Sequence, residues 1–427
     1  MRVFMLGWEF PPFISGGLGT ACYGLTKALD QLGVDVIFCL PKMVESSYTT
    51  HVKLLTPTSL SSADTLKLSE LKNVKFRTIP STLQPYSTPD IYKQRIEETL
   101  RQKQATLGGN AASAFIGGMH YSGNMYDEVH RYAALAAELA VSEQFDVVHA
   151  HDWMTYPAGI AVAASSGKPL VVHVHSTEFD RSGENVNQMI YDIERMGMEQ
   201  ADKVIAVSYF TRSIIISRYG ISGDKVEVVY NGVERNGTAA SIETDSDKDE
   251  KIVLFLGRIT MQKGPEYFLQ AAKKVLDVMD NVRFVMAGSG DLMHQAIEMA
   301  AGLGIGQKIL FTGFLCGQDV QKIYEMADLY VMTSVSEPFG IAPLEALNND
   351  VPVIISKQSG VSEVLTHALK VDFWDVTEIA NKIIAVLKYP PLGITLRNYG
   401  NSEVRKLRWK DSAAKCMKIY EESLVTV

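Results

Sequence analysis

The feature that most constrains this chain is a regular alternation of short apolar, β-branched runs with longer amphipathic segments. In the first half the apolar runs cover residues 2–8, 34–41, 146–153, 169–176, 203–208 and 225–232. In the second half they cover residues 251–258, 282–288, 308–314, 329–334 and 352–356. Between these runs lie segments whose apolar residues recur at helical spacing, as in residues 20–33, 128–143, 265–279, 292–304 and 318–327. Near-continuous apolar runs are typical of strands buried on both faces, so the alternation predicts an α/β chain with two doubly wound, Rossmann-like sheets.

The length of 427 residues also favours two domains, because it exceeds one ordinary hydrophobic core. Residues 235–250 contain almost no large apolar side chains and are predicted to be a linker. We therefore expect domains at 1–234 and 251–408, with an amphipathic helix at 409–427 after the second sheet. Residues 44–122 are too long for a simple connection and are expected to form an insertion at the strand ends, where ligands meet open sheets.

Composition narrows the class of protein. The formal net charge of -8 argues against a nucleic-acid partner. The four cysteines are far apart and form no CxxC pair, which argues against a disulfide framework and a cysteine zinc site and suits a reducing compartment. No apolar run is long enough to cross a membrane, so we expect a cytoplasmic protein without an integral membrane segment. The oligomeric state stays open.

A glycine-rich turn, "FISGGLGTACYGLTKAL", follows the first predicted strand and begins a helix. Gly16, Gly17 and Gly19 remove side chains where backbone amides and a helix N-terminus could approach a phosphate. The spacing is not GxGxxG, so the pattern does not indicate a dinucleotide fold. The alternative interpretation is a tight strand-to-helix turn.

Two histidine pairs end predicted strands, His149 with His151 and His173 with His175. Each pair lies two residues apart and so shares one face of its strand. Four imidazoles raise the possibility of zinc, but neither pair has an evident third ligand, and we expect one member of each pair to pack under a helix. Asp152 and His175, at the strand ends, are better candidates for a cleft.

The segment "FLGRITMQKG" places Arg258 and Lys263 in a polar turn at the end of a strand. Two cations there suit a diphosphate, with the guanidinium binding two oxygens and the ammonium acting as a point charge. The alternative is a pair of solvated surface charges. A further glycine turn at Gly288 and Gly290 is a weak signal by itself.

The segment "SEPFGIAPLEAL" carries two glutamates, Glu337 and Glu345, around a predicted helix start near Pro343. Exposed amides at residues 340–342 could bind phosphate or sugar oxygens. Glu345 is expected in the first helical turn, where it could simply stabilise the helix dipole. Glu337 precedes the turn, so two acids beside an amide-rich turn suggest a ligand with both phosphates and hydroxyls, such as a nucleotide sugar.

Taken in order, these motifs resemble the retaining glycosyltransferases with two Rossmann domains (GT-B), and most of all the glycogen and starch synthases and the broad related family. The resemblance runs nearly end to end through "GGLG", "HAHDW", "VVYNGVE", "LGRITMQKG", "AGSGD", "FTGF" and the paired glutamates. It implies a nucleoside diphosphate sugar as donor and a glycan as acceptor, bound on the side of the first domain. It also implies that the final helix crosses back to the first domain.

The resemblance also implies roles for individual residues. Those implied to bind the donor are Gly16, Gly17, Arg258, Lys263, Gly288, Phe314, Phe339, Gly340, Ile341 and Glu345. Those implied to take part in catalysis are Glu337, His175, Asp152, Arg258 and Lys263. Arg258 and Lys263 match the family's diphosphate-binding pair, Glu345 the acid that holds the ribose, and Glu337 the acid near the donor sugar.

The implied reaction is transfer of a hexose, with glucose favoured, to build an α-1,4-glucan, without a metal or other cofactor. Ile14 stands where bacterial synthases usually have a lysine that touches the diphosphate, so the donor stays open between ADP-glucose and UDP-glucose. One alternative is a retaining transferase that uses a UDP- or GDP-sugar to make another oligosaccharide, a disaccharide or a surface glycan. A second alternative, from another class, is a non-catalytic glucan-binding or regulatory protein.

Overall fold

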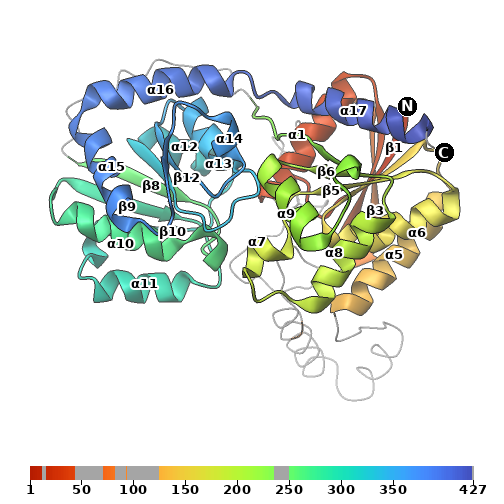
Figure 1. Ribbon diagram of the computed structural model, residues 1–427, viewed down its shortest axis with the longest axis horizontal. Helices are drawn as coiled ribbons and strands as arrows, with labels where there is room; N and C mark the ends of the chain where they lie inside the picture. Colours follow the sequence, from red (N-terminus) through yellow and green to blue (C-terminus); the bar gives the residue numbers. More distant parts are fainter. Residues whose placement is uncertain (12–15, 44–70, 82–92, 94–124, 235–249, 426–427) are drawn as a thin grey trace. The chain divides into compact units, whose positions relative to one another are not determined.

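The computed structural model describes residues 1–11, 16–43, 71–81, 93, 125–234 and 250–425 (Figure 1). Residues 235–249 of the predicted linker and most of the predicted insertion at 44–122 lie outside this description. The described residues contain two separate sheets, each flanked by helices. The predicted α/β class with two Rossmann-like sheets is therefore confirmed.

The first sheet has seven strands in the order β3-β2-β1-β4-β5-β6-β7. Its strands are β1 Arg2–Leu6, β2 Asp35–Met43, β3 Val74–Ser81, β4 Val147–His151, β5 Leu170–Val174, β6 Lys203–Ala206 and β7 Val226–Val228. The helices of this part of the chain are α1 Gly17–Gln31, α5 Met125–Val141, α6 Tyr156–Ser166, α7 Glu178–Ser182, α8 Gln188–Gln200 and α9 Tyr209–Tyr219. Strands β1, β4 and β5 are almost wholly buried, as their apolar runs predict.

Strand β3 falls within the segment that was expected to be an irregular insertion. It pairs in parallel with β2, from Val36 opposite Val74 to Met43 opposite Ser81. Its sequence alternates apolar residues with charges, and Lys75 and Arg77 both form ion pairs with Glu143. An edge strand with one charged face lacks the continuous apolar run that marks the central strands, which explains why the pattern did not indicate it.

The second sheet has six strands in the order β10-β9-β8-β11-β12-β13. Its strands are β8 Lys251–Leu256, β9 Val282–Ala287, β10 Ile309–Gly313, β11 Leu329–Met332, β12 Val353–Ser356 and β13 Leu369–Val371. The helices that follow them are α10 Pro265–Leu276, α11 Met293–Gly302, α12 Gln318–Met326, α13 Ile341–Asn348, α14 Val361–Val364, α15 Val376–Lys388 and α16 Pro390–Val404.

Both faces of the second sheet are buried, because alternate residues of each strand point to opposite sides. Val253 and Phe255 of β8 join one apolar cluster, which includes Phe268 of α10. Leu254 joins the other cluster, which includes Leu344 of α13. All of its strand pairings are parallel, as crossover helices require.

Each sheet has a point where the strand order reverses, between β1 and β4 in the first sheet and between β8 and β11 in the second. Ligands of open α/β sheets bind at the carboxyl ends of the strands at such a point. The candidate residues after β1 and β4 and those after β8 and β11 therefore lie where ligands of open α/β sheets usually bind.

By its contacts the chain divides into two compact units. The first is formed by Met1–His173, Asp192–Val204 and Cys416–Val427, and the second by Val174–Tyr191 and Ile205–Lys415. The last helix, α17 Trp409–Val425, contributes to both units. In the first unit its Tyr420 is fully buried and its hydroxyl lies 2.7 Å from Nδ1 of His149. The domain boundaries expected from the sequence stay a prediction.

Candidate functional site

The switch point of the second sheet brings a predicted cation and a predicted acid into direct contact. Lys263 lies in the loop after β8, and Glu337 lies in the loop after β11. The ammonium of Lys263 donates to Oε2 of Glu337 at 2.5 Å, and the Ser334 hydroxyl donates to the same oxygen at 3.0 Å. The Lys263 and Glu337 side chains are only 20% and 11% exposed, so water screens this ion pair weakly.

Arg258 begins the same loop, directly after β8, and its guanidinium donates to Oε1 of Gln262 at 2.9 Å. Gln262 is 3% exposed and lies in Met261–Lys263, which forms one turn of 3-10 helix. Its main-chain carbonyl accepts the N–H of Val335, in the loop that leads to Glu337. Sequence reasoning missed Gln262, although its position between the two cations of "RITMQK" was visible.

The structure corrects the predicted place of Glu345 in "SEPFGIAPLEAL". Helix α13 begins at Ile341, two residues before Pro343, and it has no acid in its first turn. Glu345 is its fifth residue, so the interaction with the helix N-terminus that was offered as an alternative explanation is weakened. The first amides of α13 precede any helical carbonyl that could accept them, and Pro343 adds no N–H. The helix start therefore presents donors suited to anionic or hydroxylic oxygens.

Glu345 is held by a tyrosine of the neighbouring helix. The hydroxyl of Tyr324, on α12, lies 3.1 Å from Oε2 of Glu345. Burial raises the pKa of Glu345 above its ordinary value, and the hydrogen bond from Tyr324 opposes this rise. Tyr324 itself is fully buried, so its hydroxyl fixes one carboxylate oxygen and leaves Glu345 with a defined orientation.

Two predicted glycines are explained by backbone geometry. Gly340 precedes α13 with φ of 106°, and a Cβ there would lie 3.0 Å from Val361 and 3.2 Å from Cγ of Glu337. Gly288 has φ of 139°, and a Cβ there would lie 1.8 Å from the carbonyl oxygen of Gly257. Both positions therefore require glycine for the fold, whatever they also contact.

The other predicted donor residues of the second sheet differ in exposure. Phe314, in the loop after β10, is 50% exposed, whereas Phe339 is 2% exposed. The ring of Phe339 packs against Tyr230 with centroids 5.8 Å apart, and its carbonyl accepts the N–H of Val361. The side chain of Phe339 is thus part of the core, which leaves its backbone N–H as the group that could meet a donor.

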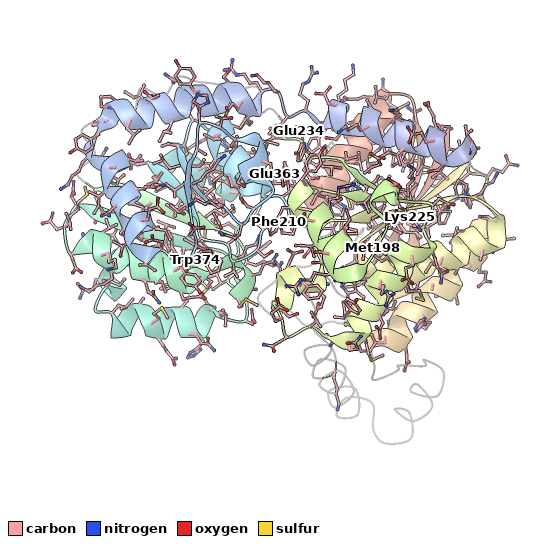
Figure 2. The ribbon with its side chains drawn as sticks, in the orientation of Figure 1. Met198, Phe210, Lys225, Glu234, Glu363 and Trp374 are labelled. Atoms are coloured by element: carbon pink, nitrogen blue, oxygen red, sulfur yellow. The ribbon has the colours of Figure 1, made fainter. Side chains whose placement is uncertain are left out.

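The turn around Glu337 is anchored within the second unit by residues that the sequence did not indicate. Asp180 accepts a hydrogen bond from the hydroxyl of Ser336 at 2.5 Å, and the Ser208 hydroxyl donates to the Pro338 carbonyl at 2.5 Å. Beside this contact Phe210 lies next to Glu363, whose carboxylate accepts the main-chain N–H of Phe210 at 2.6 Å (Figure 2). The turn is therefore fixed on both sides of Glu337.

The glycine turn of the first unit has an internal carboxylate. Oε2 of Glu9 accepts the main-chain N–H groups of Gly16 and Gly19, both at 3.1 Å, just before and within the first turn of α1. Glu9 is 1% exposed and was not predicted. The amide of Gly16 is thus already bonded within the protein. At Gly17, by contrast, no described atom beyond its chain neighbours and the backbone of its own helix lies within 4 Å of a would-be Cβ.

Asp152, directly after β4, has a strained backbone. Its φ of 61° and ψ of 167° lie in a region that few residues other than glycine adopt. Its N–H donates to the carbonyl of His173 at 3.0 Å, which holds this conformation. The negative charges of Glu9 and Asp152, after burial itself, raise the pKa of the Cys22 thiol, so both acids lie near one point of the first unit. Strain of this kind is concentrated at functional sites.

His175 lies in the second unit and is less buried by surface area than His149, His151 and His173. Burial lowers the pKa of His175 to about 3, so its imidazole is neutral at physiological pH. Ile14 and Ser15 lie outside the described residues.

Three of the four paired histidines form one cluster in the structure. His149 and His151 are both fully buried, and with His173 they form one cluster whose ring nitrogens lie within 4.8 Å of one another. One member of each pair was expected to pack under a helix, and in the first pair both members are buried. The rings of His149 and His173 are stacked at 7°, and those of His151 and His173 at 28°. The fold thus places a third imidazole beside the first pair, which the sequence did not show, and the absence of a metal stays a prediction.

Comparisons with known proteins agree with the fold. A family model described as "Glycosyl transferases group 1" matches residues 238–403, and one described as "Glycosyltransferase Family 4" matches residues 98–236. An uncharacterized glycosyltransferase of Methanocaldococcus jannaschii is 29% identical over 86% of this chain and 83% of its own length. A glycogen synthase of Mycobacterium tuberculosis is 24% identical over 86% and 80%.

Solved structures align over nearly the whole chain. Anabaena HepE, determined in complex with UDP and glucose, has a TM-score of 0.69 at 18% identity and covers 99% of this chain and 100% of its own. Sucrose-phosphate synthase from Thermosynechococcus elongatus has a TM-score of 0.71 at 18% identity, with complete coverage of both chains. At these identities the likeness shows the fold. In the part of the chain that the structure describes, no helix is both long and apolar enough to span a bilayer.

Proposed function

Because this chain belongs to the glycosyltransferases with two Rossmann domains (GT-B), we propose that it transfers a hexose from a nucleoside diphosphate sugar to a glycan, with retention at the anomeric carbon. Glucose is the favoured sugar and an α-1,4-glucan the favoured product. The similarity to a glycogen synthase and the "GGLG" and "HAHDW" segments support the glucan. Structural neighbours determined with UDP or UDP-glucose support the class of donor.

The observation that carries the proposal is the contact between Lys263 and Glu337 at the switch point of the second sheet. In the proposed complex Arg258 and Lys263 bind the diphosphate and stabilise the charge that develops on it as it leaves. Glu337 accepts hydroxyls of the transferred sugar, and Glu345 accepts those of the ribose. Asp152 and His175 would lie beside the transferred sugar.

In the proposed step a bond forms between an acceptor hydroxyl oxygen and the anomeric carbon as the bond from that carbon to the diphosphate oxygen breaks. The acceptor proton passes to the departing phosphate oxygen on the same face of the sugar, which gives retention. Two fixed cations supply the positive charge that a metal ion would otherwise supply, so we propose transfer without a metal.

The first experiment measures release of nucleoside diphosphate from ADP-, UDP- and GDP-sugars, with glycogen, maltooligosaccharide and monosaccharide acceptors. Lys263→Ala and Glu337→Ala should each reduce turnover by about a hundredfold or more. Lys322→Ala is the matched control, because Lys322 forms an exposed ion pair with Asp319 on α12. Near-normal turnover in folded Lys263→Ala or Glu337→Ala would refute the assignment.

The same experiment tests the alternatives. Turnover with a UDP- or GDP-sugar but without glucan extension would favour a transferase for another oligosaccharide, a disaccharide or a surface glycan. Glucan binding without turnover of any donor would favour a non-catalytic regulatory protein. The cations Arg258 and Lys263 argue against that role, since binding a neutral glucan requires no partner for a diphosphate.

A further inference from the structure

Gln262 is a buried polar side chain between the charged groups of the second sheet's switch point. Its Oε1 lies 2.9 Å from Nη2 of Arg258, and the residue is 3% exposed. A guanidinium has only donors, so the amide of Gln262 must turn its oxygen toward Arg258. The contact therefore fixes both partners.

The backbone of Gln262 connects the two loops that form this switch point. Its carbonyl accepts the N–H of Val335 at 2.9 Å, in the loop after β11. The next residue, Lys263, forms the ion pair with Glu337. One short turn thus sets Arg258 through the side chain of Gln262, and sets the loop that carries Glu337 through its main chain.

The chemistry of an amide matters at this position. A long arginine side chain loses rotamer freedom when it is fixed, so it binds an anion best when a neighbour already holds it. A carboxylate would hold the guanidinium but would also offset the charge that attracts an anion. An amide oxygen holds it without a compensating charge.

We propose that Gln262 is a positioning residue that holds the Arg258 guanidinium ready for the diphosphate of the donor. This inference rests on the proposed function and adds to it a residue that need not touch the donor. It makes a prediction specific to the diphosphate, because Gln262 acts through Arg258 and not through the part of the site that holds the nucleoside.

The experiment compares binding of ADP and UDP with that of adenosine and uridine by calorimetry in the full-length protein. Gln262→Met keeps the length of the side chain and removes the acceptor, and Gln262→Glu keeps the acceptor and adds a charge. Both should weaken binding of the preferred nucleoside diphosphate by about tenfold or more. Gln262→Met loses the hydrogen bond to the charged Arg258, and Gln262→Glu offsets the charge of Arg258. Binding of the matching nucleoside should change by less than about twofold.

Gln321→Met is the control, because Gln321 lies on α12 and its amide donates to Glu325 at 2.9 Å, outside the loops after β8 and β11. It should bind like the wild type, and thermal unfolding should show that each variant is folded. Unchanged diphosphate binding in both Gln262 variants, or an equal loss for diphosphate and nucleoside, would overturn the role of Gln262. A wild-type protein that binds neither ADP nor UDP would instead overturn the proposed function, and the inference with it.

Discussion

Two glycines at predicted donor sites should respond in opposite ways to an added methyl group. At Gly17, the first residue of α1, no described atom beyond its chain neighbours and the backbone of its own helix lies within 4 Å of the new Cβ, and φ is not in the left-handed region. Alanine is the better helix former by up to about 1 kcal/mol. Gly17→Ala should therefore leave the midpoint of thermal unfolding unchanged or raise it by at most about 4 °C.

At Gly288 the same methyl would lie 1.8 Å from the carbonyl oxygen of Gly257, on a residue with φ of 139°. The backbone conformation alone costs about 1–3 kcal/mol for a residue other than glycine, and the clash adds to it. Gly288→Ala should therefore lower the free energy of unfolding by about 3 kcal/mol or more.

The two variants also differ in the expected effect on function. Nothing in the described residues requires glycine at position 17, and the proposed donor site gives a reason for it. Gly17→Ala should reduce kcat/KM for the donor by roughly tenfold to a hundredfold, measured as released nucleoside diphosphate. A small displacement of the donor from its reactive position lowers the rate of transfer steeply. Gly302→Ala, on α11 and equally open, should affect neither property. Wild-type kcat/KM in Gly17→Ala would refute the reasoning.

Three further predictions concern stability. Tyr420→Phe removes the hydrogen bond to buried His149 and should lower the free energy of unfolding in urea by about 1–2 kcal/mol without changing turnover; a change in turnover would contradict this. Glu9→Gln weakens the bonds to Gly16 and Gly19 and should cost about 1 kcal/mol in the same assay, so unchanged stability would argue against the role of Glu9. Burial lowers the pKa of His175 from 6.5 to about 3, so between these pH values the unfolded state binds a proton that the folded state does not. The free energy of unfolding should therefore be highest above pH 6.5 and should fall as the pH falls toward 3. His175→Asn should therefore be less sensitive to acid than the wild type between these values, and equal sensitivity would exclude His175 as a cause.

The central strands and the residues that follow them could be predicted, because continuous apolar runs and strand-end motifs are local features of the sequence. Strand β3 could not, since Lys75 and Arg77 interrupt its apolar residues and its place is set by pairing with β2. Helix α13 begins before the proline that suggested its start, because the positive φ of Gly340 sets the boundary. Glu9, Gln262 and Tyr324 were missed for a different reason. The partners of Glu9 and Tyr324 are backbone groups or are distant in sequence, and the contact of Gln262 with Arg258, four residues away, depends on the conformation of a loop, so no spacing rule identifies these contacts.

Helix α17 has a consequence for how the protein is made. The first unit is complete only when Cys416–Val427 joins it, and the preceding segment of that unit ends at Val204. On the ribosome, about 210 residues separate those two points, which at 5–20 residues per second is a delay of roughly 10–40 s. Until Cys416–Val427 has been synthesised, the surface that buries Ile419 and Tyr420 stays exposed on the nascent chain. Helix α17 thus delays completion of the first unit until the second unit has been synthesised, and a ribosome that stalls within the second unit would release a chain able to bind chaperones.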